Sequence, residues 1–130
     1  MMGLLIRNGT HMNITIKATR HQLNDEERTL VDQKLGVIAK LLGRDADTAE
    51  LNVEVALTAD GEKHGEAWRA ETNLTAGGKF YRASASADTM ASAIEAVHKE
   101  LAQEIKSQRG RAHKMWKRGR AAIKAMLQRG

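Results

Sequence analysis

The sequence predicts an α+β fold, a two-layer sandwich in which two helices cover one face of a four-stranded sheet. Four short segments alternate between apolar and polar residues, as half-buried strands do. Two longer segments repeat apolar residues at steps of three and four, as amphipathic helices do. The Gly77-Gly78 pair between the last two alternating segments is typical of a tight hairpin turn. The expected element order is therefore β-α-β-β-β-α, followed by a basic C-terminal tail.

Each expected strand has one apolar face. The four faces are Met12, Ile14, Ile16 and Ala18; Leu51, Val53, Val55 and Leu57; Trp68, Ala70, Thr72 and Leu74; and Tyr81, Ala83, Ala85 and Ala87. A helix separates the first two strands, so we expect them to be parallel if they are neighbours. A polar loop at Ala59–Gly65 separates the second strand from the third. The third and fourth should form an antiparallel hairpin.

The first helix is expected to run from Asn24 to Gly43. Asn24 is a good N-cap, Glu27 stands three residues later as in a capping box, and a glycine is a common helix stop. Its buried stripe is Val31, Leu35, Ile38 and Leu42.

The second helix is expected to begin after Asp88 or Thr89, either of which can cap it. Its buried stripe is Met90, Ile94, Val97, Leu101 and Ile105. Both helices must cover the same face of the sheet, because no expected element remains to cover the other.

The 130 residues are expected to form one domain, at residues 12–109, with a basic tail at 110–130. Residues 1–11 fit the fold poorly and precede a second methionine, Met12, so we interpret them as a leader added by cloning. There is no cysteine, which excludes disulfides and thiolate chemistry and is compatible with a cytoplasmic protein. No apolar run approaches the roughly 18 residues that a membrane span needs.

Charge is unevenly distributed along the chain. Nine of the 21 Lys and Arg residues, and none of the 16 Asp and Glu residues, lie between Lys106 and Gly130. The rest of the chain is mildly acidic. Such asymmetry indicates a surface that binds an anion, most often nucleic acid.

Three interpretations of the tail remain open. Trp116, Ile123 and Leu127 recur at helical spacing among the cations, so residues 112–128 have the pattern of a basic amphipathic helix, weakened by Gly119. Such a segment binds phosphates, lies on an anionic membrane or in the groove of an acidic partner, or is a solvated tail.

No group of residues predicts catalysis or metal binding. His21, His64, His98 and His113 lack metal-ligand spacing, and Ser84 and Ser86 have no nearby base. We therefore expect no enzyme activity, no cofactor and no metal.

Two segments resemble a known family. Gly77–Glu95, with the pattern GG-x-x-YRASASADTMASAIE, is similar to the hairpin-to-helix signature of the ribosome hibernation-promoting factors, also called ribosomal subunit interface or ribosome-associated inhibitor proteins. Met12–Ala18, with the sequence MNITIKA, resembles their first strand, and Asn24–Gly43 matches their first helix in place and length. The resemblance covers roughly residues 12–109.

The resemblance implies a ribosome-binding translation inhibitor with a fold similar to that of double-stranded-RNA-binding domains. It implies that the protein occupies the tRNA and mRNA channel of the small ribosomal subunit under stress or in stationary phase, through basic contacts to rRNA. It implies no small-molecule substrate, no cofactor and no membrane. The alternatives are a basic-tail protein that binds an anionic membrane or acidic partner, and an RNA- or DNA-binding module that acts off the ribosome.

The second helix departs from the family's D-K-L-x-R-Q type of run, because Glu100 and Gln103 stand at two positions where bases are expected. We infer that positive charge has moved from this helix into the tail, which is too short to be the dimerisation domain of longer members. Trp116 is expected to stack on a base. The cations expected to contact phosphate are Arg28, Lys40, Arg44, Lys79, Arg82, Lys99, Lys106, Arg109, Arg111, Lys114, Lys117, Arg118, Arg120 and Lys124.

Overall fold

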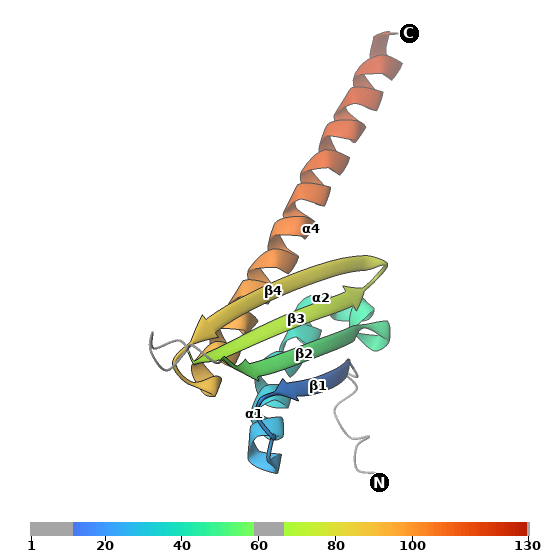
Figure 1. The fold of residues 1–130 in the computed structure, drawn as a ribbon. Helices are drawn as coiled ribbons and strands as arrows, with labels where there is room; N and C mark the ends of the chain where they lie inside the picture. The colour runs from blue at the N-terminus through green and yellow to red at the C-terminus, as the bar shows by residue number, and fades with distance from the viewer. Residues whose placement is uncertain (1–11, 59–66, 130) are drawn as a thin grey trace.

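Four strands form one mixed sheet in the order β1-β2-β3-β4 (Figure 1). The structure, a computed structural model, describes residues 12–58 and 67–129. The strands are β1 (Asn13–Thr19), β2 (Glu50–Leu57), β3 (Trp68–Ala76) and β4 (Lys79–Ala87). β1 and β2 are parallel, whereas β2 with β3 and β3 with β4 are antiparallel. The predicted element order, the parallel first pair of strands and the antiparallel hairpin of the last two are confirmed.

The register places the predicted apolar faces in line across the sheet. Leu51 pairs with Leu74, which pairs with Tyr81, and all three side chains are buried. Thr72 is a polar residue that is also buried on this face. Its hydroxyl donates a hydrogen bond to the carbonyl oxygen of Ala83 at 3.3 Å, so its polar atom is satisfied inside the core.

The turn between β3 and β4 consists of Gly77 and Gly78, both with positive φ, at 58° and 75°. Two consecutive residues with positive φ match the twist of an antiparallel hairpin, and glycine adopts that conformation without a Cβ clash. A Cβ on Gly77 would lie 2.5 Å from a carboxylate oxygen of Asp45. The glycine therefore also allows the turn to approach the segment that contains Asp45.

The first helical segment is divided, contrary to the single helix expected from Asn24 to Gly43. It consists of α1 (Asp25–Gly36), α2 (Ile38–Leu42) and a 3-10 helix, η2 (Gly43–Thr48). The break falls at Gly36-Val37, where a glycine and a β-branched residue, both weak helix formers, are adjacent. The predicted stripe is nevertheless buried, at Val31, Leu35, Ile38 and Leu42.

Both ends predicted for this segment are confirmed. The Asn24 side chain accepts a hydrogen bond from the Glu27 N–H at 2.8 Å, and the Glu27 carboxylate accepts one from the Asn24 N–H at 3.0 Å. This is a complete capping box. At the other end, Gly43 follows α2 with a φ of 64°.

The last helix, α4 (Met90–Arg129), runs without interruption for 40 residues. Thr89 caps it by accepting a hydrogen bond from the Ser92 N–H at 3.1 Å. All five predicted stripe residues are buried, and α4 packs on β3, β4 and the first helical segment. Ile105 is the last buried residue of the helix.

The helices lie on one face of the sheet, which confirms the two-layer sandwich (Figure 1). Beyond Gln108 and Arg109 the helix leaves this body. We call residues 110–129 the arm; its side chains from 110 to 128 are all exposed. At about 1.5 Å per residue, the arm is about 30 Å long. Residues 1–11, interpreted as a leader, and the expected loop residues 59–65 lie outside the described residues.

Candidate nucleic-acid interface

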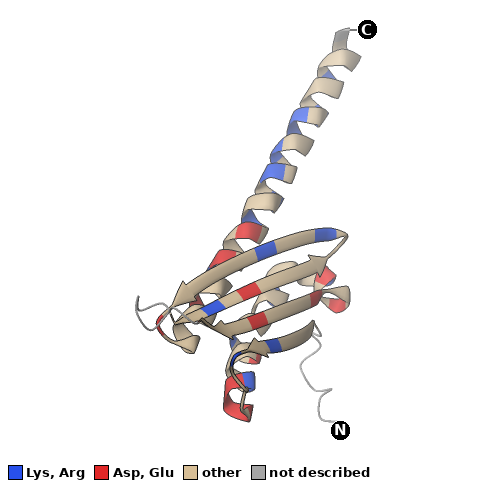
Figure 2. Cartoon of the chain, in the orientation of Figure 1, with Lys and Arg blue, Asp and Glu red and all other residues tan. Residues whose placement is uncertain are grey.

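Cations line the arm, and no carboxylate accompanies them. The described ones are Arg111, Lys114, Lys117, Arg118, Arg120 and Lys124. Figure 2 shows blue segments along the arm, with red segments confined to the rest of the molecule. Because the helix holds these side chains at fixed intervals, the arm is a rod of positive charge and not a loose tail.

The arm is anchored where it leaves the body, at a site that we call the junction: Leu41, Leu42, Asp45, Phe80, Gln108 and Arg109. The Arg109 guanidinium donates to the carbonyl oxygens of Leu41 at 2.7 Å and Leu42 at 3.3 Å. It also lies 3.5 Å from the Asp45 carboxylate. These carbonyls belong to the end of α2, so Arg109 bonds α4 to the point where α2 meets η2.

Gln108 ties the same point of α4 to the sheet. Its side-chain amide donates to the carbonyl oxygen of Phe80 on β4 at 3.3 Å and to the Glu104 carboxylate at 2.8 Å. Since Asp45 also approaches Gly77, the hairpin turn, η2 and α4 all come together at the junction.

Four of the predicted site residues surround the junction. Lys40, Arg44 and Lys79 are each adjacent in sequence to a junction residue, and Lys106 lies two residues before Gln108. All four side chains are exposed. Lys40 and Lys106 also line the same groove between α2 and α4. The fold thus gathers cations from α2, η2, β4 and α4 around the base of the arm.

These four cations are available to bind an anion. Within the described ranges, ion pairs join Lys34 to Glu95 at 3.0 Å and Arg69 to Glu71 at 2.8 Å, and none involves the four cations around the junction. A cation that has no carboxylate partner loses no ion pair when it binds a phosphate. The cations around the junction are therefore available to phosphate, and the arm extends the positive charge outward from them.

Arg109 has a different position from the other predicted site residues. Its side chain is 40 % exposed, and its guanidinium is already bonded to two carbonyls beside a carboxylate. This geometry assigns Arg109 to anchoring the arm. The sequence pattern does not predict that role, nor those of Gln108 and Asp45. One signal was present: Gln108 occupies the next stripe position after Ile105, and a polar residue there indicates a specific bond.

Three predicted cations lie away from the junction. Arg28 is in the first turns of α1, next to a run of three carboxylates. The contacts of Lys34 with Glu95 and of Arg109 with Leu42 show that α1 and α2 run parallel to α4, so Arg28 lies at the end of the helical layer remote from the arm. Lys99 is exposed midway along the body part of α4.

Arg82 lies on the outer face of the sheet at its β4 edge, in a depression that it shares with Arg69, Glu71, Ser84 and, from α4 around that edge, Glu100. Glu54 and Glu71 are directly opposite each other near the centre of that face. Thr19 donates to the Glu54 carboxylate at 2.6 Å. Because acids and bases are mixed here, the outer face attracts phosphate less than the junction does.

Trp116 is exposed on the arm, and the Arg120 guanidinium lies 4.7 Å from its ring centroid. This cation–π contact covers one face of the indole. The arrangement pairs a cation with an aromatic face, as base-stacking sites do.

The two shifted acids belong to structural contacts. The hydrogen bond from the Asn24 N–H, together with the contact with His21, lowers the pKa of Glu27 below its ordinary value. Its contact with Lys34 lowers the pKa of Glu95. Both groups lie in the helical layer away from the cations of the junction, so neither indicates acid–base chemistry at the candidate interface.

Within residues 12–58 and 67–129, no three potential metal-ligating side chains come together. No helix in the same ranges is apolar over a length that would cross a membrane.

The fold and its extension define the class of this protein: a small α+β sandwich whose last helix continues as a cationic arm. The chain belongs to the family described as sigma 54 modulation protein / S30EA ribosomal protein, whose model matches residues 14–113. The predicted membership of the ribosome hibernation-promoting factor family is confirmed. A search of curated proteins finds no match.

Two solved structures share the fold. The N-terminal domain of Protein Y from Thermus thermophilus matches with a TM-score of 0.62 and 21% identity, over 74% of this chain and 98% of that one. A ribosomal subunit interface protein from Coxiella burnetii matches with a TM-score of 0.60 and 14% identity, over 76% of this chain and 99% of that one. The family match ends at residue 113, so most of the arm lies beyond it.

Proposed function

We propose that this protein is a ribosome-binding translation inhibitor that occupies the tRNA and mRNA channel of the small ribosomal subunit in stressed or stationary cells. One observation supports the proposal above the others. On a domain of a ribosome-associated family, cations without ion-pair partners among the described residues gather at the junction and continue along the arm. Such a surface suits folded RNA, and the site of action is then the cytoplasm.

The mechanism requires binding and no chemistry. Cations at the junction contact rRNA phosphates and release their counterions, which supplies affinity without sequence readout. The sandwich positions these cations from four different elements. A domain held in this way excludes tRNA and mRNA by occupying their volume.

The arm then follows a groove of the rRNA from the point where the body is bound. Trp116 stacks on an unpaired base with the face that Arg120 leaves free. The proposed phosphate contacts are Lys40, Arg44, Lys79, Lys106, Arg111, Lys114, Lys117, Arg118, Arg120 and Lys124, with Arg28, Arg82 and Lys99 as outlying contacts.

The test is co-sedimentation of the full chain with purified small subunits, combined with translation in a reconstituted extract. The variant Lys79→Gln/Lys106→Gln removes two cations from around the junction. The control Lys17→Gln/Arg20→Gln removes the same charge from exposed cations at the β1 side of the sheet, away from the junction. The junction variant should lose subunit binding and inhibition, whereas the control should keep both.

Pre-bound tRNA provides a test of the channel itself. Subunits loaded with tRNA and mRNA should retain less protein than vacant subunits at the same ionic strength. Equal retention would place the protein elsewhere on the ribosome. If the protein binds free RNA yet stays at the top of the gradient when subunits are present, it is an RNA-binding module that acts off the ribosome.

A further inference from the structure

The arm carries an apolar stripe of which the proposed RNA contacts involve only Trp116. Ala112, Trp116, Gly119, Ile123 and Met126 follow at steps of four, three, four and three, which continues the buried stripe of the body along the same side of α4. Met115 and Leu127 flank it. In the body this stripe packs on the sheet, whereas on the arm Met126 is 69% and Leu127 77% exposed.

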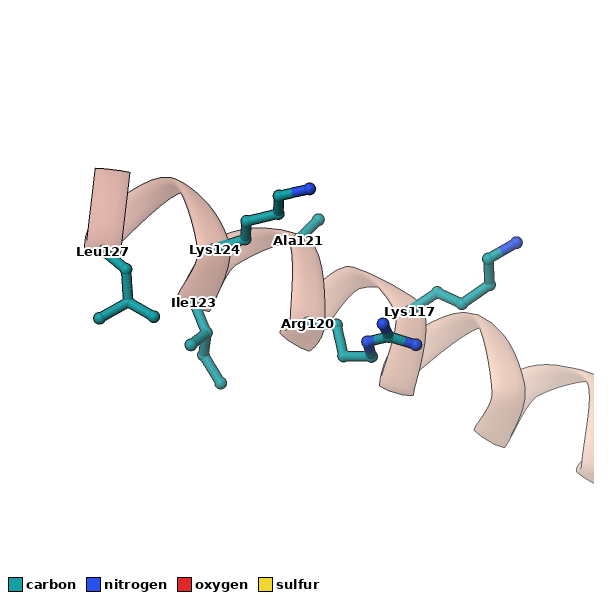
Figure 3. A pocket seen from close by; sticks show the side chains of 6 residues that line it. All are labelled: Lys117, Arg120, Ala121, Ile123, Lys124 and Leu127. Carbon is teal, nitrogen blue, oxygen red and sulfur yellow. The ribbon is translucent and has the colours of Figure 1, made fainter. Parts of the chain in front are cut away.

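The stripe is flanked by cations on both sides. Arg111, Lys114 and Arg118 recur at helical spacing along one side, and Lys117, Arg120 and Lys124 along the other. Figure 3 shows Ile123 and Leu127 projecting from one side of the helix, with Lys117 and Lys124 on the opposite side and Arg120 between them. Among the described residues, the depression between these side chains is lined by α4 alone.

We propose that this stripe docks into a groove of a ribosomal protein whose floor is apolar and whose rim carries carboxylates. The proposal rests on the proposed function, since ribosome binding by the body brings the arm to its partner. RNA is a poor partner for Ile123, Met126 and Leu127, because phosphates and riboses offer little apolar surface. An amphipathic helix in an apolar groove buries such residues at steps of three and four.

The flanking charges determine the chemistry of the rim. A second copy of the arm would place cations against cations on both sides, which disfavours self-association. Carboxylates along the rim of the groove would instead pair with them. When the rim pairs with one row of cations, the other row remains free, so one arm can contact a ribosomal protein and rRNA at once.

Gly119 favours a shaped protein groove over a lipid surface. It lies within the stripe and costs helix stability, yet a Cβ there would contact nothing within 4 Å in the part of the chain that the structure describes. The packing of the chain itself therefore does not require a glycine at this position. Between Trp116 and Ile123 it leaves a notch that admits a projecting side chain or a crossing helix. A fluid bilayer gains nothing from such a notch.

The experiment compares two probes: salt-washed small subunits, and the rRNA extracted from them. Full-length Ile123→Gln/Leu127→Gln removes the apolar contacts and keeps good helix formers. The matched control, Ala121→Gln/Ala125→Gln, places the same residues on the opposite side of the arm. We expect the stripe variant to bind subunits about 10- to 100-fold more weakly, and rRNA within about twofold of the unmodified protein. The control should bind both normally.

Each other outcome overturns the inference in an identifiable way. Equal losses on subunits and on extracted rRNA would show that the stripe contacts RNA, and unchanged subunit binding would show that it is unused. If the unmodified protein binds vesicles with 30 mol% phosphatidylglycerol at about 0.15 M salt and the stripe variant does not, the stripe contacts lipid. If the unmodified protein self-associates as its concentration rises and the stripe variant does not, the stripe contacts a second copy of the chain. If the unmodified protein does not bind subunits, the proposed function fails first and the docking with it.

Discussion

Removing the arm should make binding to small subunits much less sensitive to salt. The perturbation is a truncation after Arg109, which deletes residues 110–130 and leaves intact the bonds of Gln108 and Arg109 at the junction. The body therefore keeps its helix anchor and its neighbouring cations. Only the arm's charge and apolar stripe are lost.

The size of the effect follows from how the cations are distributed around α4. Three lie along each side of the apolar stripe, so RNA that follows one side contacts about three, and RNA that contacts both sides about six. Each phosphate contact contributes about 0.7 to 0.9 to the slope of log affinity against log salt. Truncation should therefore reduce the magnitude of the slope by about 2 to 5.

The assay is the affinity for purified small subunits, measured from 50 to 300 mM KCl by fluorescence anisotropy of an end-labelled protein. The variant Lys117→Gln/Arg120→Gln/Lys124→Gln neutralises one side of the arm, and Arg111→Gln/Lys114→Gln/Arg118→Gln neutralises the other. Comparing them identifies the side that faces RNA. An unchanged slope in the truncated protein would refute a role of the arm in phosphate binding.

Three further predictions concern the scaffold. Arg109→Met should destabilise the fold by about 1–2 kcal/mol, or roughly 3–8 °C in Tm, after allowance for its partial exposure. Arg111→Met should change Tm little, because the bond of Arg111 to Ser107 lies within α4 itself. Equal shifts in thermal unfolding would contradict the anchoring role. Gly77→Ala should lower the free energy of urea unfolding by about 1 kcal/mol more than Gly78→Ala does. Both glycines have positive φ, but only a methyl group on Gly77 would be pushed into Asp45. Similar losses of stability would mean that the turn and η2 do not depend on each other. The pKa of Glu27 is lowered in the folded state, so its carboxylate stabilises the fold above the ordinary value of 4.5 and loses this contribution as pH falls through the lower folded value. Glu27→Gln should therefore lose less stability than the unmodified protein between about pH 5 and about pH 3. An identical pH profile would count against the capping box as the source of the effect.

The sandwich was predictable from sequence because its main determinants are local and periodic. Alternation along each strand determined which residues face the core, and Leu51, Leu74 and Tyr81 are buried as expected. Gly77-Gly78 determined the hairpin, and the Asn24–Glu27 spacing determined the start of α1. These signals lie within a few residues of the features that they produce.

The junction was not predictable in the same way. Arg109 bonds to a carbonyl 68 residues earlier in the chain, and its sequence neighbourhood is that of any other cation in the basic segment. Its role depends on α2 ending beside α4, which is a tertiary fact. The break at Gly36-Val37 similarly depends on packing, since the apolar stripe continues across it without a change of spacing.

The unbroken path of α4 also determines the rotational phase of the arm. Because no hinge separates the last buried residue, Ile105, from the first exposed cations, the direction in which each arm side chain points is inherited from the core. Deleting one residue near Gly110 would leave composition and charge almost untouched, yet it would turn everything beyond by about 100°. The number of residues between core and arm is thus a specificity determinant in its own right.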